Sequence, residues 1–194
     1  MGLSLVTSPV VEPISLPEAK AHLRIDGSDS DNEIVSMIAA ARAQLENVTR
    51  RRFVQQTWDY TLPRFPSGDI YLPTQPVSSI TSVNYVNGSG VSTPFTDFTL
   101  ISDGPRSRVV PDYNVSWPTT REHGNAVTVR FVTGYEPSTD SPQDLTKNIP
   151  ADIKSAMKII ISDMYENRES WTPLQMNELP GLLTLYSPYI LRGF

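Results

Sequence analysis

The segment SDNEIVSMIAAARAQLENV, residues 30–48, decides how the first part of this chain folds. Ser30 and Glu33 stand at the spacing of a capping box, and Arg50-Arg51-Arg52 follows near the predicted end, where cations favour the helix dipole. A helix with one apolar stripe must bury that stripe against another element. The apolar residues of the stripe recur at steps of four, three, four and three: Ile34, Ile38, Ala41, Leu45 and Val48.

Three more helices are expected, one before this segment and two near the end of the chain. A second capping box, Ser15-Leu16-Pro17-Glu18, predicts a helix that runs to Arg24 or Ile25. Pro150 predicts the start of another helix, which should end around Arg168–Glu169, and Glu178–Ile190 is expected to hold a last one. The helix after Pro150 has one apolar face, formed by Ile153, Ala156, Met157, Ile160, Ile161 and Met164.

Between the helical stretches the apolar residues alternate with period two, which predicts strands. The clearest strands are Ala126–Thr133 and Val77–Val86, and the second ends in Asn87-Gly88-Ser89-Gly90, a strong hairpin signal. Shorter strands are expected at residues 54–62, 69–72, 98–101 and 108–110.

These patterns predict an α+β fold, in which N- and C-terminal segments form a helical bundle and an antiparallel β region is inserted between them. The expected divisions are residues 1–52 for the N-terminal helices, 53–147 for the β-rich insertion and 148–194 for the C-terminal helices. The stretch EPSTDSPQDLTKNI, residues 136–149, is typical of a linker.

Composition excludes several classes of protein. The 194 residues include no cysteine, which excludes a disulfide scaffold, cysteine-ligated zinc, iron–sulfur clusters and a thiol nucleophile. The net charge of -5 argues against a protein whose main task is to coat duplex phosphate. No apolar run is long enough to span a bilayer, so we expect no membrane partner.

No catalytic, cofactor or metal-binding motif is present, and we expect none of these functions. His22 and His123 could bind metal together with Glu122, but they lack ligand spacing. The alternating acids Asp26, Asp29 and Asp31 resemble the start of a calcium loop, yet Met37 stands where the loop needs its glutamate. Turn and helix-cap roles explain these acids better.

Two further groups invite a nucleic-acid interpretation. The run Arg50-Arg51-Arg52 could contact phosphate, although dipole complementation explains it more simply. Five aromatic residues could stack on single-stranded bases, although packing in the sheet core is the favoured interpretation: Trp58, Tyr60, Tyr71, Tyr85 and Trp117.

The C-terminal segment is apolar on nearly every side. Such a segment either docks on the helices of its own chain or docks on another protein, because free apolar area favours aggregation. The sequence leaves both alternatives open. Under the second, the candidate binding residues are Leu182, Leu183, Leu185, Tyr186, Tyr189, Ile190, Arg192 and Phe194.

An ordered set of short motifs resembles the head–tail connector (adaptor) family of tailed phages, whose members also occur in prophages and gene transfer agents. The set begins with LPEAKAHLR at residues 16–24 and IAAAR at 38–42. It continues with LP at 72–73, PVSSI at 76–80, WP at 117–118 and VTVRF at 127–131, and then IPADIK at 149–154. The most recognisable piece is YENRE at 165–169, and SPY at 187–189 resembles the family's ending. The resemblance covers nearly the whole chain.

The resemblance implies a structural, non-enzymatic role in the virion neck, between capsid and tail, after assembly in the host cytoplasm. It implies a ring of copies of this chain, usually twelve, that binds the portal protein, extends the DNA channel and receives the stopper or tail-completion protein. DNA would pass through without sequence-specific binding, and the acidic balance fits such a channel. It also implies that the C-terminal segment reaches the portal. The alternatives are a stopper or tail-completion protein, or a small hydrolase or carbohydrate-binding module built on the β region.

Overall fold

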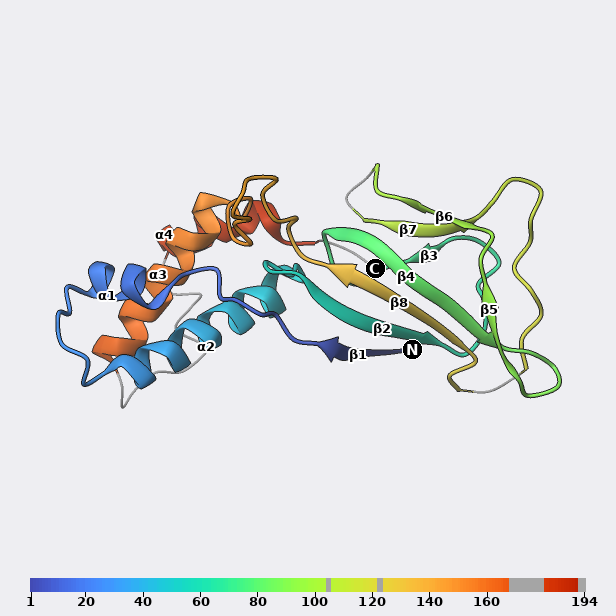
Figure 1. The fold of residues 1–194 in the computed structure, drawn as a ribbon, viewed down its shortest axis with the longest axis horizontal. Helices are drawn as coiled ribbons and strands as arrows, with labels where there is room; N and C mark the ends of the chain where they lie inside the picture. The colour runs from blue at the N-terminus through green and yellow to red at the C-terminus, as the bar shows by residue number, and fades with distance from the viewer. Residues whose placement is uncertain (104–105, 122–123, 168–179, 192–194) are drawn as a thin grey trace. The chain divides into compact units, whose positions relative to one another are not determined.

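The computed structural model describes residues 1–103, 106–121, 124–167 and 180–191. It confirms a mixed α+β chain whose strands pair only in antiparallel fashion in the described residues. The chain divides into two compact units (Figure 1). A β unit contains residues 1–9 and 55–135, and a helical unit contains residues 10–54 and 136–194. No helix in the described part of the chain is long and apolar enough to cross a membrane.

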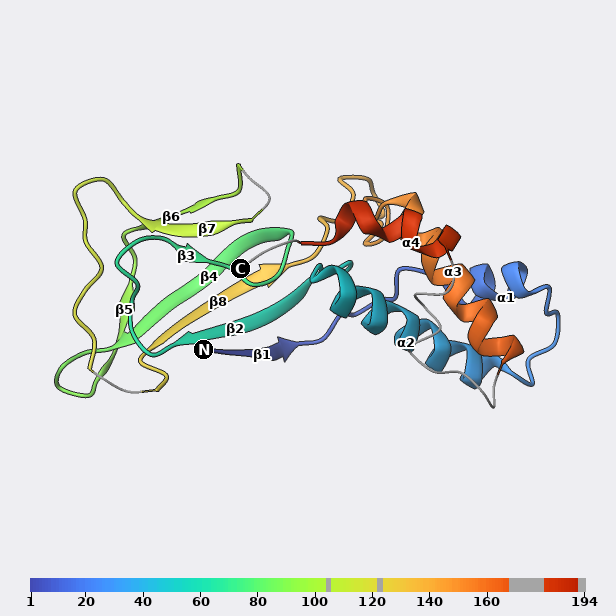
Figure 2. The ribbon, with the colours of Figure 1, turned by 180° about the vertical axis from the view of Figure 1, so that it is seen from behind.

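The β unit contains two sheets, which can be followed from both sides in Figures 1 and 2. The first has the order β1-β2-β8-β4-β5, and the second has the order β3-β7-β6. Their bounds are β1 Gly2–Thr7, β2 Gln56–Leu62, β3 Ile70–Tyr71, β4 Val77–Val86, β5 Ser92–Phe95, β6 Phe98–Ile101, β7 Arg108–Pro111 and β8 Val127–Thr133.

Period-two alternation builds the core of the β unit. Along β8 every second residue is buried, and Phe131 lies opposite Trp58 while Val129 lies opposite Tyr60. The other face of β2 and β8 is mostly polar, and Arg130 pairs there with Asp59, its cross-strand neighbour, at 2.8 Å. One buried cluster combines residues of both sheets, including Ile70 and Val109 from the smaller one.

Strand β1 was not expected from the sequence, which predicted only helices in residues 1–52. Gly2–Thr7 pairs with β2, with Leu3 opposite Tyr60 and Leu5 opposite Trp58. Its two leucines therefore continue the core-facing side of β2, although the burial pattern of the whole strand is exposed. The alternation is too short to distinguish from a loop by periodicity alone.

The helical unit contains α1 (Leu16–Leu23), α2 (Asp31–Thr49), α3 (Ala151–Glu166), α4 (Pro180–Tyr186) and a 3₁₀ turn at Ser187–Tyr189. Helix α3 packs against α1, α2 and α4. All six predicted apolar residues of α3 are buried. In α2 the predicted stripe is buried from Ile34 to Leu45, but Val48 is exposed and Thr49 takes the buried position.

The two predicted capping boxes differ in outcome. Ser15 Oγ accepts a hydrogen bond from the Glu18 backbone N–H at 3.3 Å, as predicted. Ser30 makes no such side-chain bond, so the second box does not form as expected. Helix α2 ends where Arg50 adopts a left-handed conformation with φ of 57°, which leaves no cation in its last turn. The arginine run therefore does not complement the helix dipole from within the helix.

Candidate functional site

The described part of the C-terminal segment lies on the helical unit of its own chain. Leu182, Tyr186 and Leu191 are buried, and α4 packs against α3. Two residues of the candidate binding set, Leu182 and Tyr186, thus belong to the core of this unit, together with Leu191 from the same segment. Docking on the helices of its own chain therefore accounts for the buried side of the segment.

Hydrogen bonds fix the end of the segment to α2 and α3. The Leu191 backbone N–H donates to the Thr49 carbonyl at 3.1 Å, and Arg51 Nε donates to the Tyr189 carbonyl at 2.8 Å. The Tyr189 hydroxyl donates to Asp152 in the first turn of α3 at 3.4 Å. Burial and the nearby Asp152 carboxylate raise the pKa of Tyr189, so its hydroxyl keeps the proton that it donates.

The opposite side of the segment remains accessible in the isolated chain. Leu183 is 43% exposed, although it directly follows the buried Leu182. Leu185, Tyr189 and Ile190 are half-buried. Arg192 and Phe194, which complete the predicted binding set, lie outside the described residues. Within the described part of the segment, Leu183 is thus the one large apolar residue that is exposed.

A buried charge cluster at the end of α2 was not predicted from the sequence. Glu46 is only 3% exposed and lies between two arginines, with Arg42 Nη1 at 3.1 Å and Arg52 Nη1 at 3.6 Å. Arg42 also binds both carboxylate oxygens of Glu12, at 2.7 and 3.2 Å. The other Glu46 oxygen accepts the Phe53 backbone N–H at 2.9 Å. The sequence signal was a glutamate beside Leu45 on the buried stripe, four residues after an arginine.

This cluster gives the arginine run a structural role. Arg51 holds the C-terminal segment, and Arg52 lies 9% exposed beside Glu46. Burial lowers the pKa of Arg52, while the Glu46 carboxylate opposes that shift. Two of the three arginines thus bind groups of their own chain instead of forming an open patch for phosphate.

The predicted aromatic set is divided between core and surface. Tyr60 is buried, and Trp58, Tyr85 and Trp117 pack against the buried cluster, while Tyr71 is 48% exposed. These residues do not form an exposed row on which bases could stack. Packing in the core of the sheets therefore accounts for four of the five aromatic residues, all except Tyr71.

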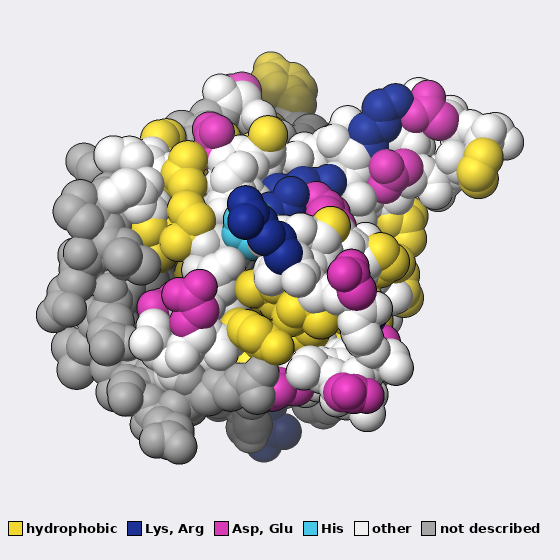
Figure 3. All heavy atoms as spheres, turned by 90° about the vertical axis from the view of Figure 1, so that its left-hand side faces the viewer, with side chains coloured by type: hydrophobic (Ala, Val, Ile, Leu, Met, Phe, Trp, Pro, Cys, Tyr) yellow, Lys and Arg dark blue, Asp and Glu magenta, His cyan; other side chains and the backbone are white. Residues whose placement is uncertain are grey.

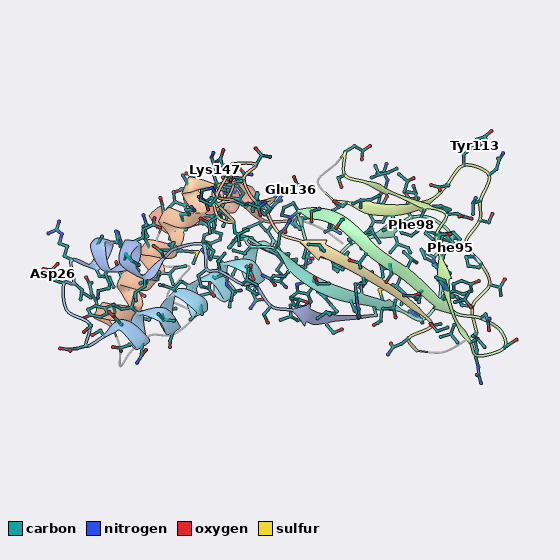
Figure 4. All side chains as sticks on the ribbon, in the orientation of Figure 1. Asp26, Phe95, Phe98, Tyr113, Glu136 and Lys147 are labelled. Carbon is teal, nitrogen blue, oxygen red and sulfur yellow. The ribbon has the colours of Figure 1, made fainter. Side chains whose placement is uncertain are left out.

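Further aromatic contacts join loops and strands within the β unit. Phe65 stacks on Trp117 with ring centroids 4.7 Å apart and an angle of 7° between the planes. Phe95 contacts both rings and also Phe98, and Figure 4 labels Phe95 and Phe98. Trp117 Nε1 donates to the Gly68 carbonyl at 2.8 Å and thereby joins two loops.

An open pocket of about 830 Å³ adjoins this aromatic pair. It is lined by Met1, by Leu62 at the end of β2, by residues 63–67 of the loop that follows and by residues 117–120 of the loop before β8. Its wall combines the Phe65 and Trp117 rings and several prolines with Arg64 and hydroxyl groups. The wall of this pocket therefore offers apolar surface and polar groups side by side.

The candidate metal ligands are dispersed. His22 is exposed on α1, and Asp31 forms an ion pair with Lys20 at 2.6 Å. Both His123 and Glu122 lie outside the described residues. Within the described ranges there is no group of three or more histidine, cysteine, aspartate or glutamate residues that could hold a metal ion. On the face drawn in Figure 3, side chains of both charges lie among hydrophobic ones.

Comparison with known proteins gives matches of two kinds, to a family model and to solved structures. Residues 13–87 match the model of a family described as Phage gp6-like head-tail connector protein. The chain also matches a structure described as the neck of an empty GTA particle computed with C6 symmetry, with a TM-score of 0.81 and 23% identity. A structure described as the virion of a native gene transfer agent (GTA) particle matches with a TM-score of 0.78 and 21% identity. A structure described as the neck of a native GTA particle computed with C12 symmetry matches with a TM-score of 0.75 and 23% identity.

The structural matches extend over the whole molecule, with 100% of this chain and 98% of the matched chain covered in each case. A search of curated proteins found no match. The predicted resemblance to the head–tail connector family is confirmed by the family match, which spans α1, α2, β2, β3 and β4. The fold of the whole chain is that of a protein chain found in these GTA particles.

Proposed function

We propose that this chain is a structural head–tail connector in the neck of a phage or phage-like particle. The observation that carries the proposal is the match of the full chain, at a TM-score of 0.81, to a chain in a GTA neck structure. The match to the connector family model over residues 13–87 supports the same assignment from sequence. The proposed role is mechanical and involves no catalysis, cofactor or metal ion.

In this role, copies of the chain form a ring under the portal, extend the DNA channel and receive the stopper or tail. The C6 and C12 symmetries of the matched neck structures support a cyclic arrangement, and we propose twelve copies. A closed ring uses a head-to-tail interface, in which two different faces of the subunit meet. The net charge of -5 favours a channel wall that does not hold DNA phosphates.

We further propose that the accessible side of the C-terminal segment contacts the portal. Leu183 is central because it is exposed beside a buried neighbour. The hydrogen bonds of Leu191 and Tyr189 to α2 and α3 hold the segment in place before the portal binds. Leu182 and Tyr186 contribute indirectly, by fixing the segment to the helical unit. The proposed contact set also retains Leu185, Ile190, Arg192 and Phe194.

The test mixes purified protein with portal-bearing capsids that lack it, and follows binding by co-sedimentation and electron microscopy. Wild-type protein should form a ring at the portal vertex, whereas Leu183→Glu should keep its melting temperature and fail to bind. Val91→Glu is the matched control, because Val91 is an exposed apolar residue of the β unit and should tolerate the change. Leu182→Ala should lower stability by about 2–5 kcal/mol, as expected for a buried leucine.

The outcomes separate the two parts of the proposal. Normal binding of the Leu183→Glu variant would contradict the proposed portal contact. It would not affect the separate proposal that copies of this chain form a ring. Wild-type protein that binds tails or a stopper ring, and never the portal vertex, would identify a stopper or tail-completion protein instead.

A further inference from the structure

Strand β1 forms an unprotected edge of the five-stranded sheet. Its six residues are all exposed, and its sequence GLSLVT contains neither a charged residue nor a proline. Within the described part of the chain, only β2 pairs with it. Soluble proteins usually protect such edges with lysine, proline or a covering element, because a free edge attracts another strand. The edge of β1 therefore has the chemistry of a strand-addition site.

The other edge of the same sheet is protected. Strand β5 has only four residues and includes Pro94, which lies opposite Asn84. The Asn87 backbone N–H donates to the Val91 carbonyl, and alternation from this pair places the nitrogen of Pro94 on the side away from β4. Because proline has no N–H to donate, a strand from another copy would pair poorly with β5.

These two edges limit how copies of this chain can extend the five-stranded sheet into one another. Continuation of one sheet into the next around a ring would need β1 of one copy to pair with β5 of its neighbour, and Pro94 disfavours that pairing. Pairing of β1 with β1 would relate two copies by a twofold axis, which does not build a larger cyclic ring. A strand from a different protein meets neither obstacle.

The pocket supplies a second feature at the start of the strand. Met1 directly precedes β1 and lines the pocket beside Phe65 and Trp117. A strand that pairs with β1 and continues beyond Gly2 would run toward Met1, and we expect it to place one apolar side chain in this pocket. Backbone pairing would then provide affinity, and the pocket would provide specificity.

We propose that the β1 edge binds an extended segment of a different neck protein, which adds to the five-stranded sheet as a sixth strand. This inference rests on the proposed function, and it identifies strand pairing as the way in which the connector binds the next neck protein. The segment should carry apolar residues on the side of Leu3 and Leu5, which are exposed and lie opposite Tyr60 and Trp58 in the sheet. Its other side should be polar, because Ser4 lies beside Asp59, the partner of Arg130.

A site-specific crosslink tests the proposal in assembled particles. The chain contains no cysteine, so Ser4→Cys introduces one reactive thiol on the exposed edge, to which benzophenone maleimide is attached. After particle assembly and irradiation, mass spectrometry should identify a crosslink from this position to a neck protein other than this chain. Thr99→Cys, at the exposed position of the edge strand β6 in the smaller sheet, is the control and should not give that product.

Crosslinks from Ser4→Cys only to a second copy, or to no protein, would overturn the proposal. Leu3→Lys provides an independent check, since a lysine on the edge should disfavour strand addition while the strand stays paired with β2. Heads carrying Leu3→Lys should retain the ring and lose their tails. A normal yield of tailed particles would contradict the inference, whereas absence of wild-type protein from the heads would instead contradict the proposed function.

Discussion

At the scale of single residues, Glu46 is the clearest case of a charge that the fold requires. Its carboxylate lies between Arg42 and Arg52 and accepts the Phe53 backbone N–H, and the side chain is almost fully buried. Because Glu12 also binds Arg42, the cluster connects the segment before α1, the helix α2 and the segment after it.

Replacement of Glu46 by alanine should therefore destabilise the protein by about 3–5 kcal/mol, because it leaves buried arginines without their shared carboxylate. Glu46→Gln should cost less, since an amide oxygen can still accept from Phe53. Urea unfolding followed by circular dichroism measures both changes, with the exposed Glu166→Ala as control. Equal stability of Glu46→Ala and the control would show that the cluster contributes little.

At the scale of elements, the sequence predicted the regular parts and missed those that depend on tertiary pairing. The bounds of β4 were predicted as Val77–Val86, because a long alternating run ends at a hairpin signal. Strand β5 was missed because Pro94 argues against a strand, and only its edge position allows it. Strand β1 was missed because its alternation is short and gains meaning only from pairing with β2.

The C-terminal segment shows the same limit for the candidate site. Its apolar residues were identified from sequence, but their division into a buried and an accessible side could not be predicted. A segment that is apolar all round has no stripe to orient it. Contacts of α4 with α3, and of Tyr189 and Leu191 with distant residues, set that orientation.

Because part of this segment is buried, truncation tests whether it contributes to the core of the helical unit. A chain that ends at Ser170 loses Leu182, Tyr186 and Leu191, and so exposes the face of α3 that they cover. We expect a clearly lower melting temperature and aggregation, because both the core and its cover are damaged. A chain that ends at Leu191 should keep the wild-type melting temperature in the same scan. An unchanged melting temperature after truncation at Ser170 would show that the segment adds nothing to the core.

At the scale of the whole molecule, each unit is assembled from two separate parts of the sequence. The chain crosses between the units three times, after residues 9, 54 and 135. The β unit has its own core around Phe131, and the helical unit has another around Leu45. The functional proposals divide in the same way, with the portal contact on the helical unit and strand addition on the β unit.

Two cores of this kind should unfold as two transitions, because each unit buries its own apolar residues. Phe131 and Leu45 are both fully buried, so replacement by alanine should cost about 3–5 kcal/mol for Phe131 and 2–5 kcal/mol for Leu45. In differential scanning calorimetry, Phe131→Ala should lower the midpoint of one transition and Leu45→Ala that of the other. The double variant should lower each midpoint by the amount that the corresponding single variant does, since the two sites share no core. A single transition that both substitutions shift together would show instead that the units fold as one cooperative body, and that a change at one binding surface is felt at the other.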